Sequence, residues 1–490
     1  MSDHQQQGNA ALKSKAVRGG FVTLSAQMAM IAIQMASVII LSRLLPPEDF
    51  GIIAMIMALI AFMTLFRDMG LSTASIQKVT LSNEQVSTLF WVNVAAGLVL
   101  TALVLALSPL VAWFYSRPEL QAVCAALSVS FLITSVGAQH GAMMQRELRF
   151  LPKAIADVSG ALVNLLIACT LAFKGLGYWS LAVGTIAGAL TTTTLYLALG
   201  RFRVGRPRRG QGIREMLGFG ADVTGFEIAN YFSRNLDNIL LGRIWGPSAL
   251  GAYSRAYQLM MLPIYSLRTP INAVAFPVLS RLRNDPAAFR HYYCRVSTLL
   301  AFLSMPLMAF LCVNSRNVIS VSIGDKWLSV VPIFVLLGIT GFIQPVAGLR
   351  GMVLLSLGHS RRYLIWGVLN AAAVCLSFVV GVNWGPEGIA LAYALVNYAI
   401  LYPSLVFSFK DSPLSTSDFF RSISLPLLGS AIASAINFFL LRTTALSSPI
   451  ESIAINFVVF TTAYIGCIAV VPKGRETLKF YAKLIRNPEQ

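Results

Sequence analysis

The sequence is poor in charge and in the residues that build most catalytic centres. Of its 490 residues only 12% are Asp, Glu, Lys or Arg, there are four histidines, and the six cysteines occur singly, without paired spacing. Single cysteines favour neither a disulfide framework nor a metal site, and the histidines fall in the N-terminal tail or in predicted loops. We therefore expect no bound metal and no cofactor.

Motifs of hydrolases and of nucleotide-driven machines are also missing. The chain has no G-x-x-x-x-G-K-[ST] phosphate loop, no G-x-S-x-G elbow and no H-E-x-x-H zinc motif. The predicted external connections are short, the longest running roughly from Ser315 to Leu328, which leaves little room for a catalytic domain. These absences indicate a transport protein without its own ATPase, and not an enzyme.

Long apolar runs are what the sequence has in abundance. Hydrophobic residues make up 56% of the chain, and a mean hydropathy of +0.70 is typical of polytopic membrane proteins. A spanning helix needs about 20 apolar residues, and fourteen segments approach that length. They centre on residues 20–41, 50–67, 89–114, 120–138, 154–173, 177–199, 220–242, 250–280, 296–314, 328–349, 363–382, 387–408, 421–441 and 452–471.

The basic residues predict how these segments are oriented. A net charge of +18 could suggest nucleic acid, but the Lys and Arg residues are scattered over short connections and share no single face. Of the 38 Lys and Arg residues, 28 fall in the alternate connections that include both termini, and seven in the opposite set. Cytoplasmic loops carry the excess of positive charge, so both termini are predicted to be cytoplasmic.

An internal repeat divides the chain. Segments 41–51 and 241–251 match at an offset of 200 residues, with the same Leu, Arg, Pro and Gly at equivalent positions. Both segments close the first hairpin of a six-helix bundle on the external side. The expected fold is an all-α membrane protein of 14 transmembrane helices, with two pseudo-symmetric six-helix lobes and two C-terminal helices.

The predicted parts follow from these boundaries. They are a cytoplasmic N-terminal segment 1–19, an N-lobe 20–200, a basic cytoplasmic linker 201–219, a C-lobe 220–409, the last two helices within 410–472 and a basic cytoplasmic tail 473–490.

Five charges interrupt the apolar runs of the seventh and eighth predicted helices, which are joined by the turn 243–247. They are Glu227, Arg234 and Asp237 on the first helix and Arg255 and Arg268 on the second. In an antiparallel hairpin, Asp237 would lie level with Arg255 and Glu227 with Arg268. Each charge at the bilayer centre costs about 2.5 to 3.5 kcal/mol, so these groups need partners or water.

Two interpretations of these charges remain open. The five groups could form ion pairs that hold two helices together. Alternatively, they could line a water-filled cavity whose surplus positive charge binds an anionic group during transport. In the second case Glu227 or Asp237 is the candidate coupling acid. Further polar residues within the helices are helix-to-helix hydrogen-bonding groups or secondary cavity contacts. Those retained as cavity candidates are Gln27, Gln34, Asn230 and Gln344.

Several sequence stretches resemble the bacterial polysaccharide flippases, in particular the colanic acid exporter branch of the multidrug, oligosaccharidyl-lipid and polysaccharide exporter superfamily. The main matches are the run Asn235–Leu259 and the run Phe276–Leu282. Supporting matches, in the same order along the chain, are the stretches 50–52, 68–77, 88–93, 144–150, 177–181 and 324–327.

The resemblance implies two six-helix lobes around a cavity and a lipid-linked substrate. That substrate is an undecaprenyl-pyrophosphate-linked oligosaccharide, an exopolysaccharide precursor carried between the leaflets of the bacterial inner membrane. It implies headgroup contacts by Arg234 and Arg255, which lie in the matching run, and more weakly by Arg268. The implied partners are this substrate, membrane lipids and the polysaccharide polymerase and co-polymerase machinery, with no nucleic acid.

Three other functions are weighed against this one. A multidrug-extrusion antiporter usually has twelve helices and an acid in the N-terminal lobe, whereas the only candidate here, Asp157, is expected close to a helix end. A peptidoglycan lipid precursor flippase shares the fourteen helices. A membrane enzyme of glycan assembly is disfavoured by the short external connections.

Overall fold

The computed structural model describes residues 3–68, 82–207, 213–443 and 448–486, without the side chains of 3–18, 68, 213–230, 473 and 481–486. Within these ranges the chain consists of α-helices and three short 3-10 helices and contains no strand, which confirms the all-α prediction for the described residues. The chain forms two compact units, Met1–Gly251 and Ala252–Gln490.

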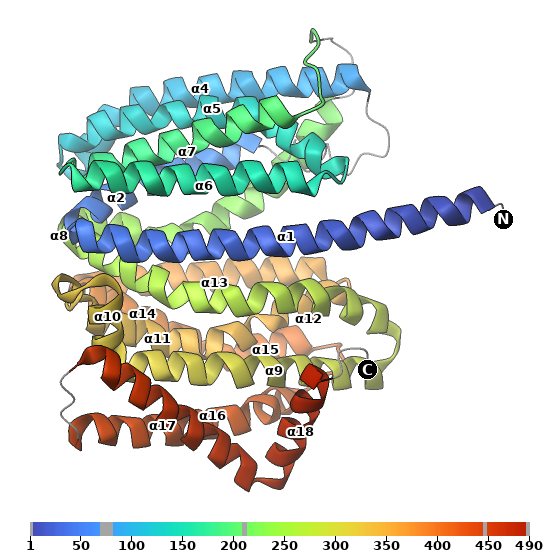
Figure 1. Ribbon diagram of the computed structural model, residues 1–490, viewed down its shortest axis with the longest axis vertical. Helices are drawn as coiled ribbons and strands as arrows, with labels where there is room; N and C mark the ends of the chain where they lie inside the picture. The colour runs from blue at the N-terminus through green and yellow to red at the C-terminus, as the bar shows by residue number, and fades with distance from the viewer. Residues whose placement is uncertain (1–2, 69–81, 208–212, 444–447, 487–490) are drawn as a thin grey trace. The chain divides into compact units, whose positions relative to one another are not determined.

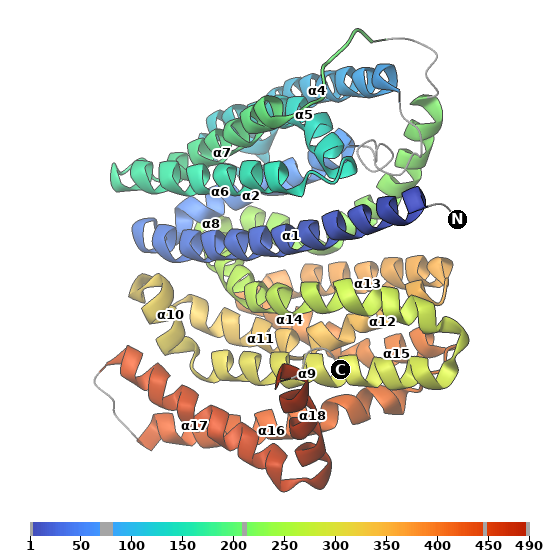
Figure 2. The same ribbon diagram turned by 45° about the vertical axis from the view of Figure 1, so that its right-hand side comes forward.

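The first unit is a bundle in which α4, α5, α6 and α7 run side by side (Figures 1 and 2). Its helices are α1 (Asp3–Leu44), α2 (Pro47–Asp68), α4 (Asn83–Tyr115), α5 (Glu119–Arg146), α6 (Phe150–Phe173), α7 (Tyr178–Leu199) and the first arm of α8 (Ile213–Arg281). The backbone of α8 leaves helical geometry at Gly246, where φ is 81°. The break falls inside the predicted turn 243–247, so α8 comprises two helices, here called its first and second arms.

The second unit begins at Ala252, six residues after this interruption, and contains the second arm of α8. Its other α-helices are α9 (Pro286–Val313), α10 (Ser315–Ile323), α11 (Val330–Ala347), α12 (Leu349–Ser356), α13 (Ser360–Gly381), α14 (Gly385–Ala399), α15 (Leu401–Phe409), α16 (Thr416–Thr443), α17 (Pro449–Val470) and α18 (Pro472–Arg486). Its 3-10 helices are Leu282–Asn284, Asp325–Trp327 and Val382–Trp384.

Eleven helical segments of the described chain are long and apolar enough to cross a membrane. One of them, Ser360–Phe409, is 50 residues long and covers two of the predicted spans. Another, Val330–Ser356, extends seven residues beyond the predicted span 328–349. The two arms of α8, which carry the five charges predicted to lie in the membrane, are not among the eleven. The protein is thus a multi-pass membrane protein.

Glycines bring the backbones of α6 and α7 into close contact. A Cβ atom on Gly160 would lie 2.9 Å from the carbonyl oxygen of Gly188, and one on Gly188 would lie 2.8 Å from that of Gly160. Gly184, one turn before Gly188, approaches the Asn164 carbonyl in the same way. Small residues four apart allow such close packing between membrane helices. This packing fixes the positions of the neighbouring side chains on α6 and α7, several of which line a cavity described below.

The two repeated turns pack against each other reciprocally. A Cβ atom on Gly51 would lie 1.8 Å from the Pro247 carbonyl oxygen, and one on Gly251 would lie 1.8 Å from the Pro47 carbonyl oxygen. Residues that are 200 positions apart therefore make equivalent contacts. Gly51 packs on Pro247 in the same way as Gly251 packs on Pro47. Only glycine fits at either position, because the opposing atom belongs to the backbone.

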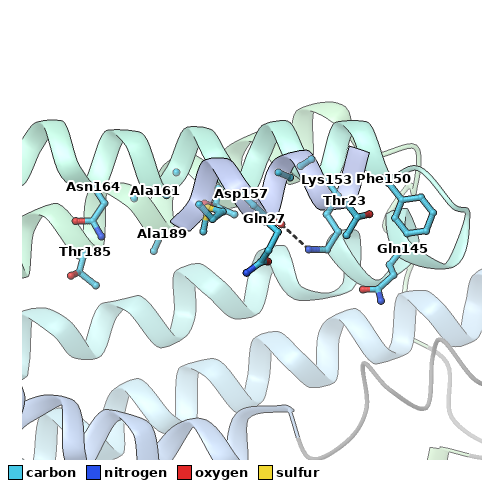
Figure 3. Close-up of a pocket in the computed structure, with 16 residues that line it drawn as sticks. Thr23, Gln27, Gln145, Phe150, Lys153, Asp157, Ala161, Asn164, Thr185 and Ala189 are labelled. Atoms are coloured by element: carbon cyan, nitrogen blue, oxygen red, sulfur yellow. Dashed lines mark hydrogen bonds and ion pairs between the residues drawn. The ribbon is translucent and has the colours of Figure 1, made fainter. Parts of the chain in front are cut away.

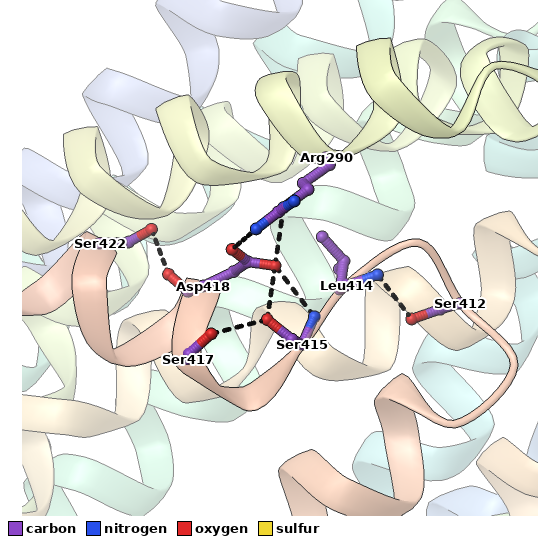
Figure 4. A network of polar contacts seen from close by, with 7 residues as sticks. All are labelled: Arg290, Ser412, Leu414, Ser415, Ser417, Asp418 and Ser422. Atoms are coloured by element: carbon purple, nitrogen blue, oxygen red, sulfur yellow. Dashed lines mark hydrogen bonds and ion pairs between the residues drawn. The ribbon is translucent and has the colours of Figure 1, made fainter.

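A bidentate ion pair fastens α16 to α9 in the second unit (Figure 4). The Arg290 Nη2 and Nε atoms donate to the two carboxylate oxygens of Asp418, at 2.6 and 3.0 Å. Asp418 also accepts hydrogen bonds from the backbone N–H and the hydroxyl of Ser415, just before α16 begins. The carboxylate is buried, with 4% of the residue exposed, and it accepts four hydrogen bonds from Arg290 and Ser415.

Replacing Asp418 with Asn should lower the apparent melting temperature by about 2–4 °C, because the neutral amide cannot accept both guanidinium bonds. Differential scanning fluorimetry of the purified protein measures this. Arg290→Met should act equally, and the double variant should be no worse than Asp418→Asn alone. Arg421→Met, an exposed change on the same helix, is the matched control and should leave the transition in place.

Candidate functional site

A polar cavity of about 520 Å³ lies within the first unit (Figure 3). Its walls come from α1, α6 and α7, and Gln145 of α5 contributes at one end. Gln145 and Phe150 lie at one end of the cavity, and Asn164 and Thr185 at the other. Such a cavity is unusual inside apolar helices, since buried polar groups need partners or water. The polar residues that line it are Thr23, Gln27, Gln145, Lys153, Asp157, Asn164, Thr185 and Thr192.

An ion pair lies at the wall of this cavity. Lys153 Nζ donates to Asp157 Oδ2 at 2.8 Å, one turn along α6, and about 30% of the Asp157 side chain stays accessible. The Tyr196 hydroxyl of α7 donates to the other carboxylate oxygen, Oδ1, at 2.5 Å. The Lys153 ammonium also lies 5.9 Å from the centre of the Tyr196 ring. Asp157 is thus held from two helices while Lys153 still faces the cavity.

A second cavity, of about 380 Å³, adjoins the first. The two share Gln145, Lys153, Ala189 and Thr192 as lining residues. Arg67, from the end of α2, lines the second cavity and donates to the Thr134 hydroxyl of α5 at 3.0 Å. With Arg67 and Lys153 against Asp157, the described lining of the two cavities carries one more positive than negative charge.

The arrangement is suited to binding and not to bond cleavage. Its hydroxyl and amide groups can exchange hydrogen bonds with a polyhydroxylated molecule, and the ammonium and guanidinium groups can hold an anion. Of the residues predicted from sequence, Gln27 lines the first cavity. Gln34, two turns further along α1, is exposed and is not among the residues that line it.

The charges of α8 are distributed over both units. Arg234 is exposed, whereas Asp237 is 4% exposed and accepts the backbone N–H of Asn238 through Oδ1 at 2.8 Å. The side chains of Glu227 and Asn230 lie outside the described residues. Since Asp237 belongs to the first unit and Arg255 to the second, the ion pairs drawn across the hairpin stay predictions.

The second unit holds the other arginines. Arg255 is half-buried, and its Nη1 donates to Gln258 Oε1 at 2.6 Å. The guanidinium of Arg268 lies against Gly348, where a Cβ atom would approach its Cζ to 2.7 Å. Arg350, two residues after Gly348, donates through Nη1 to the Ala347 carbonyl at 3.0 Å.

Gln344, the remaining predicted cavity residue, is on α11 of this unit. Its Nε2 lies 3.4 Å from the Tyr393 hydroxyl of α14, and the residue is half-buried. Its backbone carbonyl accepts the N–H of Gly348, the residue that contacts Arg268. Gln344 therefore lies one turn before the break between α11 and α12, where Arg268 lies against Gly348.

Three of these groups lie within helices. Lys153 belongs to α6, and Arg350 lies inside the long segment Val330–Ser356. Asp157 was expected close to a helix end, but it lies about two turns inside α6 and at the cavity wall. The signal that could have found it is the opposite charge four residues earlier, which marks one helix face.

Eleven apolar segments of spanning length, together with polar cavities inside a helical unit, define a polytopic membrane protein of the transporter class. The chain belongs to the polysaccharide biosynthesis protein family, whose sequence model matches residues 40–332. This confirms the family resemblance, and the protein is a flippase-type transporter and not an enzyme.

Three relatives show what the chain is similar to. The Escherichia coli lipopolysaccharide biosynthesis protein WzxC is 26% identical over 83% of this chain and 85% of its own length. The Bacillus subtilis teichuronic acid biosynthesis protein TuaB is 29% identical over 77% of this chain and 79% of its own. The Rhizobium meliloti succinoglycan biosynthesis transport protein ExoT is 23% identical over 88% of both chains.

Solved structures with the same fold include two transporters. The lipid II flippase MurJ in an inward closed conformation covers 96% of this chain and all of its own, with a TM-score of 0.75 and 13% identity. An inward-facing multidrug resistance MATE family transporter covers 87% of this chain and 99% of its own, with a TM-score of 0.58 and 13% identity. At these identities the likeness concerns the fold alone.

Proposed function

We propose that this protein moves an undecaprenyl-pyrophosphate-linked oligosaccharide repeat unit from the cytoplasmic to the periplasmic leaflet of the bacterial inner membrane. The observation that carries the proposal is the pair of adjoining cavities in the first unit, where hydroxyl, amide and surplus cationic groups lie among apolar helices. The relative ExoT is described as a transport protein of succinoglycan biosynthesis, which supports the same class of cargo.

The chemistry of the cavities fits such a cargo. A sugar and a pyrophosphate are strongly hydrated, and transferring even one unpaired polar group into hydrocarbon costs about 4 to 8 kcal/mol. Ammonium and guanidinium donors replace the hydration of phosphate oxygens by charge-assisted hydrogen bonds, and amides and hydroxyls do so for sugar hydroxyls. The lipid tail stays in the bilayer, so the protein needs to shelter only the headgroup.

The proposed architecture has fourteen transmembrane helices. The segment Ser360–Phe409 supplies two spans and the two arms of α8 supply two more, beside the other ten apolar segments. The N-lobe comprises residues 20–200, the C-lobe residues 220–409, and the last two helices lie within 410–472. The two lobes rock about the bound headgroup and give alternating access, as in other transporters built from repeats.

Arg234, Arg255 and Arg268 are proposed to bind the headgroup after it leaves the cavities of the first unit. Glu227 or Asp237 is the proposed coupling acid. We propose that both termini are cytoplasmic. The cytoplasm-negative potential favours outward movement of each negative charge by about 2.3 kcal/mol per 100 mV. Polysaccharide polymerase and co-polymerase proteins are the proposed partners that receive the cargo.

Deletion of the gene tests the proposal. The strain should lose its exopolysaccharide and accumulate the lipid-linked repeat unit, which stays accessible only from the cytoplasmic side. Lipid extraction with mass spectrometry measures the accumulation, and a membrane-impermeant sugar-binding probe on intact spheroplasts measures the side. Drug sensitivity without accumulation would instead identify a multidrug antiporter, and lethal wall failure a peptidoglycan precursor flippase.

A further inference from the structure

An apolar cavity of about 430 Å³, here called the aromatic pocket, lies between α2, α4 and the first arm of α8. It is separate from the polar cavities, with which it shares no lining residue. Six aromatic residues line it, namely Phe62, Trp113, Phe114, Tyr115, Tyr231 and Phe232. The rest of its lining is aliphatic.

The walls of the aromatic pocket offer little to a polar ligand. The Phe62 and Tyr231 rings lie 5.1 Å apart, and the Tyr231 and Phe232 rings 5.3 Å apart, in the tilted and edge-on arrangements that stabilise aromatic clusters. The Tyr231 hydroxyl donates to the Ala58 carbonyl at 2.5 Å, so its polar group is already used inside the protein. An apolar ligand is the one that such walls accept.

The pocket is open at its side. Trp113 is 74% exposed and Phe232 41% exposed, so two of its rings form a rim and not a sealed wall. Its lining residues on α2 and α8 lie no more than about 23 Å along the helix from Pro47 and Gly246, at a rise of 1.5 Å per residue. A bilayer core is about 30 Å thick, so the lining of the pocket reaches from near one interface to beyond the middle of the membrane.

A cationic group stands at the interfacial end. The Arg243 guanidinium lies 5.8 Å from the centre of the Phe114 ring, and its Nη1 lies 3.4 Å from the Ser116 hydroxyl that follows α4. Arg243 is exposed beside the pocket that Phe114 lines. The site thus combines an apolar slot that reaches beyond the bilayer middle with a guanidinium near one interface, and this is the pattern of a phosphate-bearing lipid.

We propose that the aromatic pocket binds the polyprenyl chain of the carried lipid once its headgroup has reached the external side, with the lipid phosphate at Arg243. This inference rests on the proposed function. The predicted topology puts the connection containing Arg243 outside, so the occupied state is the one from which product leaves. The first arm of α8 then contacts both parts of the lipid. Phe232 contacts the polyprenyl chain, and Arg234, two residues further on, is the proposed headgroup contact.

Photo-crosslinking in cells that make the lipid-linked repeat unit tests the site. p-Benzoylphenylalanine replaces Trp113, and the full-length protein is irradiated, purified and analysed for attached lipid by mass spectrometry. The matched control carries the same group at Val99, an exposed apolar position on the same helix that does not line the pocket. We expect a polyprenyl adduct at Trp113 and at most a trace at Val99.

Arg243→Ala should lower the polyprenyl adduct about tenfold, and Arg243→Lys should restore part of it, because one charge-assisted contact is worth about 1.5 kcal/mol or more. A phospholipid adduct alone, equal adducts at both positions, or an adduct indifferent to Arg243→Ala would overturn the inference. If export is intact, none of these outcomes contradicts the proposed function. The proposed function itself would be contradicted if the deletion strain failed to accumulate the lipid-linked repeat unit.

Discussion

Replacing Gly51 with alanine should abolish the folded protein, and Gly251→Ala should do the same. Each new Cβ atom would lie 1.8 Å from a proline carbonyl oxygen of the other repeated turn, and a backbone atom cannot move aside as a side-chain end can. Overpacking a core commonly costs about 1–3 kcal/mol, and we expect more here because the turns are fixed on both sides. Fluorescence size-exclusion chromatography of tagged protein measures the folded fraction.

Gly20→Ala is the matched control, since it lies in a helix with no neighbour within 4 Å of the new atom. It should leave abundance unchanged or slightly raised, because alanine favours helix over glycine by about 1 kcal/mol. A folded, monodisperse Gly51→Ala protein would show that the two turns separate without cost. The close packing of the repeats would then have no part in stability.

Replacing Lys153 with alanine should lower transport on the order of 100-fold while leaving protein abundance near normal. The change removes the ammonium that both polar cavities share and leaves Asp157 to repel an anionic headgroup. A charge-assisted contact worth about 3 kcal/mol corresponds to that factor. The readout is export of the repeat unit in the deletion strain, normalised to protein in the membrane.

The exchange variant Lys153→Asp with Asp157→Lys is the informative control. It keeps the ion pair within α6 and the total charge of the cavities, so it should recover abundance and part of the transport that Lys153→Ala loses. Abundance that falls in parallel with transport in Lys153→Ala would instead assign the pair to helix packing.

The sequence predicted the apolar architecture far better than the polar site. Apolar runs mark the spanning helices directly, and the repeated Pro and Gly of segments 41–51 and 241–251 marked two turns that the structure brings into reciprocal contact. The site depends on which helices meet, which a run of apolar residues does not encode. Gly184 and Gly188, four residues apart, were the signal for the α6–α7 contact.

The polar residues were harder to weigh from sequence for a related reason. Lys153 and Asp157 near the start of an apolar run look like interfacial groups, and Tyr196 looks like an ordinary aromatic residue until α7 is placed beside α6. The charges of α8 stood out because each lies deep within an apolar run. The sequence therefore drew attention to the charges that cost most to bury. The polar cavities are instead lined by Lys153, Asp157 and Tyr196, which do not stand out in the sequence.

Transport in proteoliposomes tests the central claim most directly. Purified protein is reconstituted with a pyrophosphate-linked oligosaccharide lipid and, in parallel, with a neutral glycolipid of the same sugar and tail, and the fraction reaching the opposite leaflet is followed by a sugar-oxidising probe. We predict rapid movement of the pyrophosphate lipid, slow movement of the neutral one, and loss of this preference in Lys153→Ala and Arg255→Ala. Equal movement of both lipids by the unaltered protein would contradict the account.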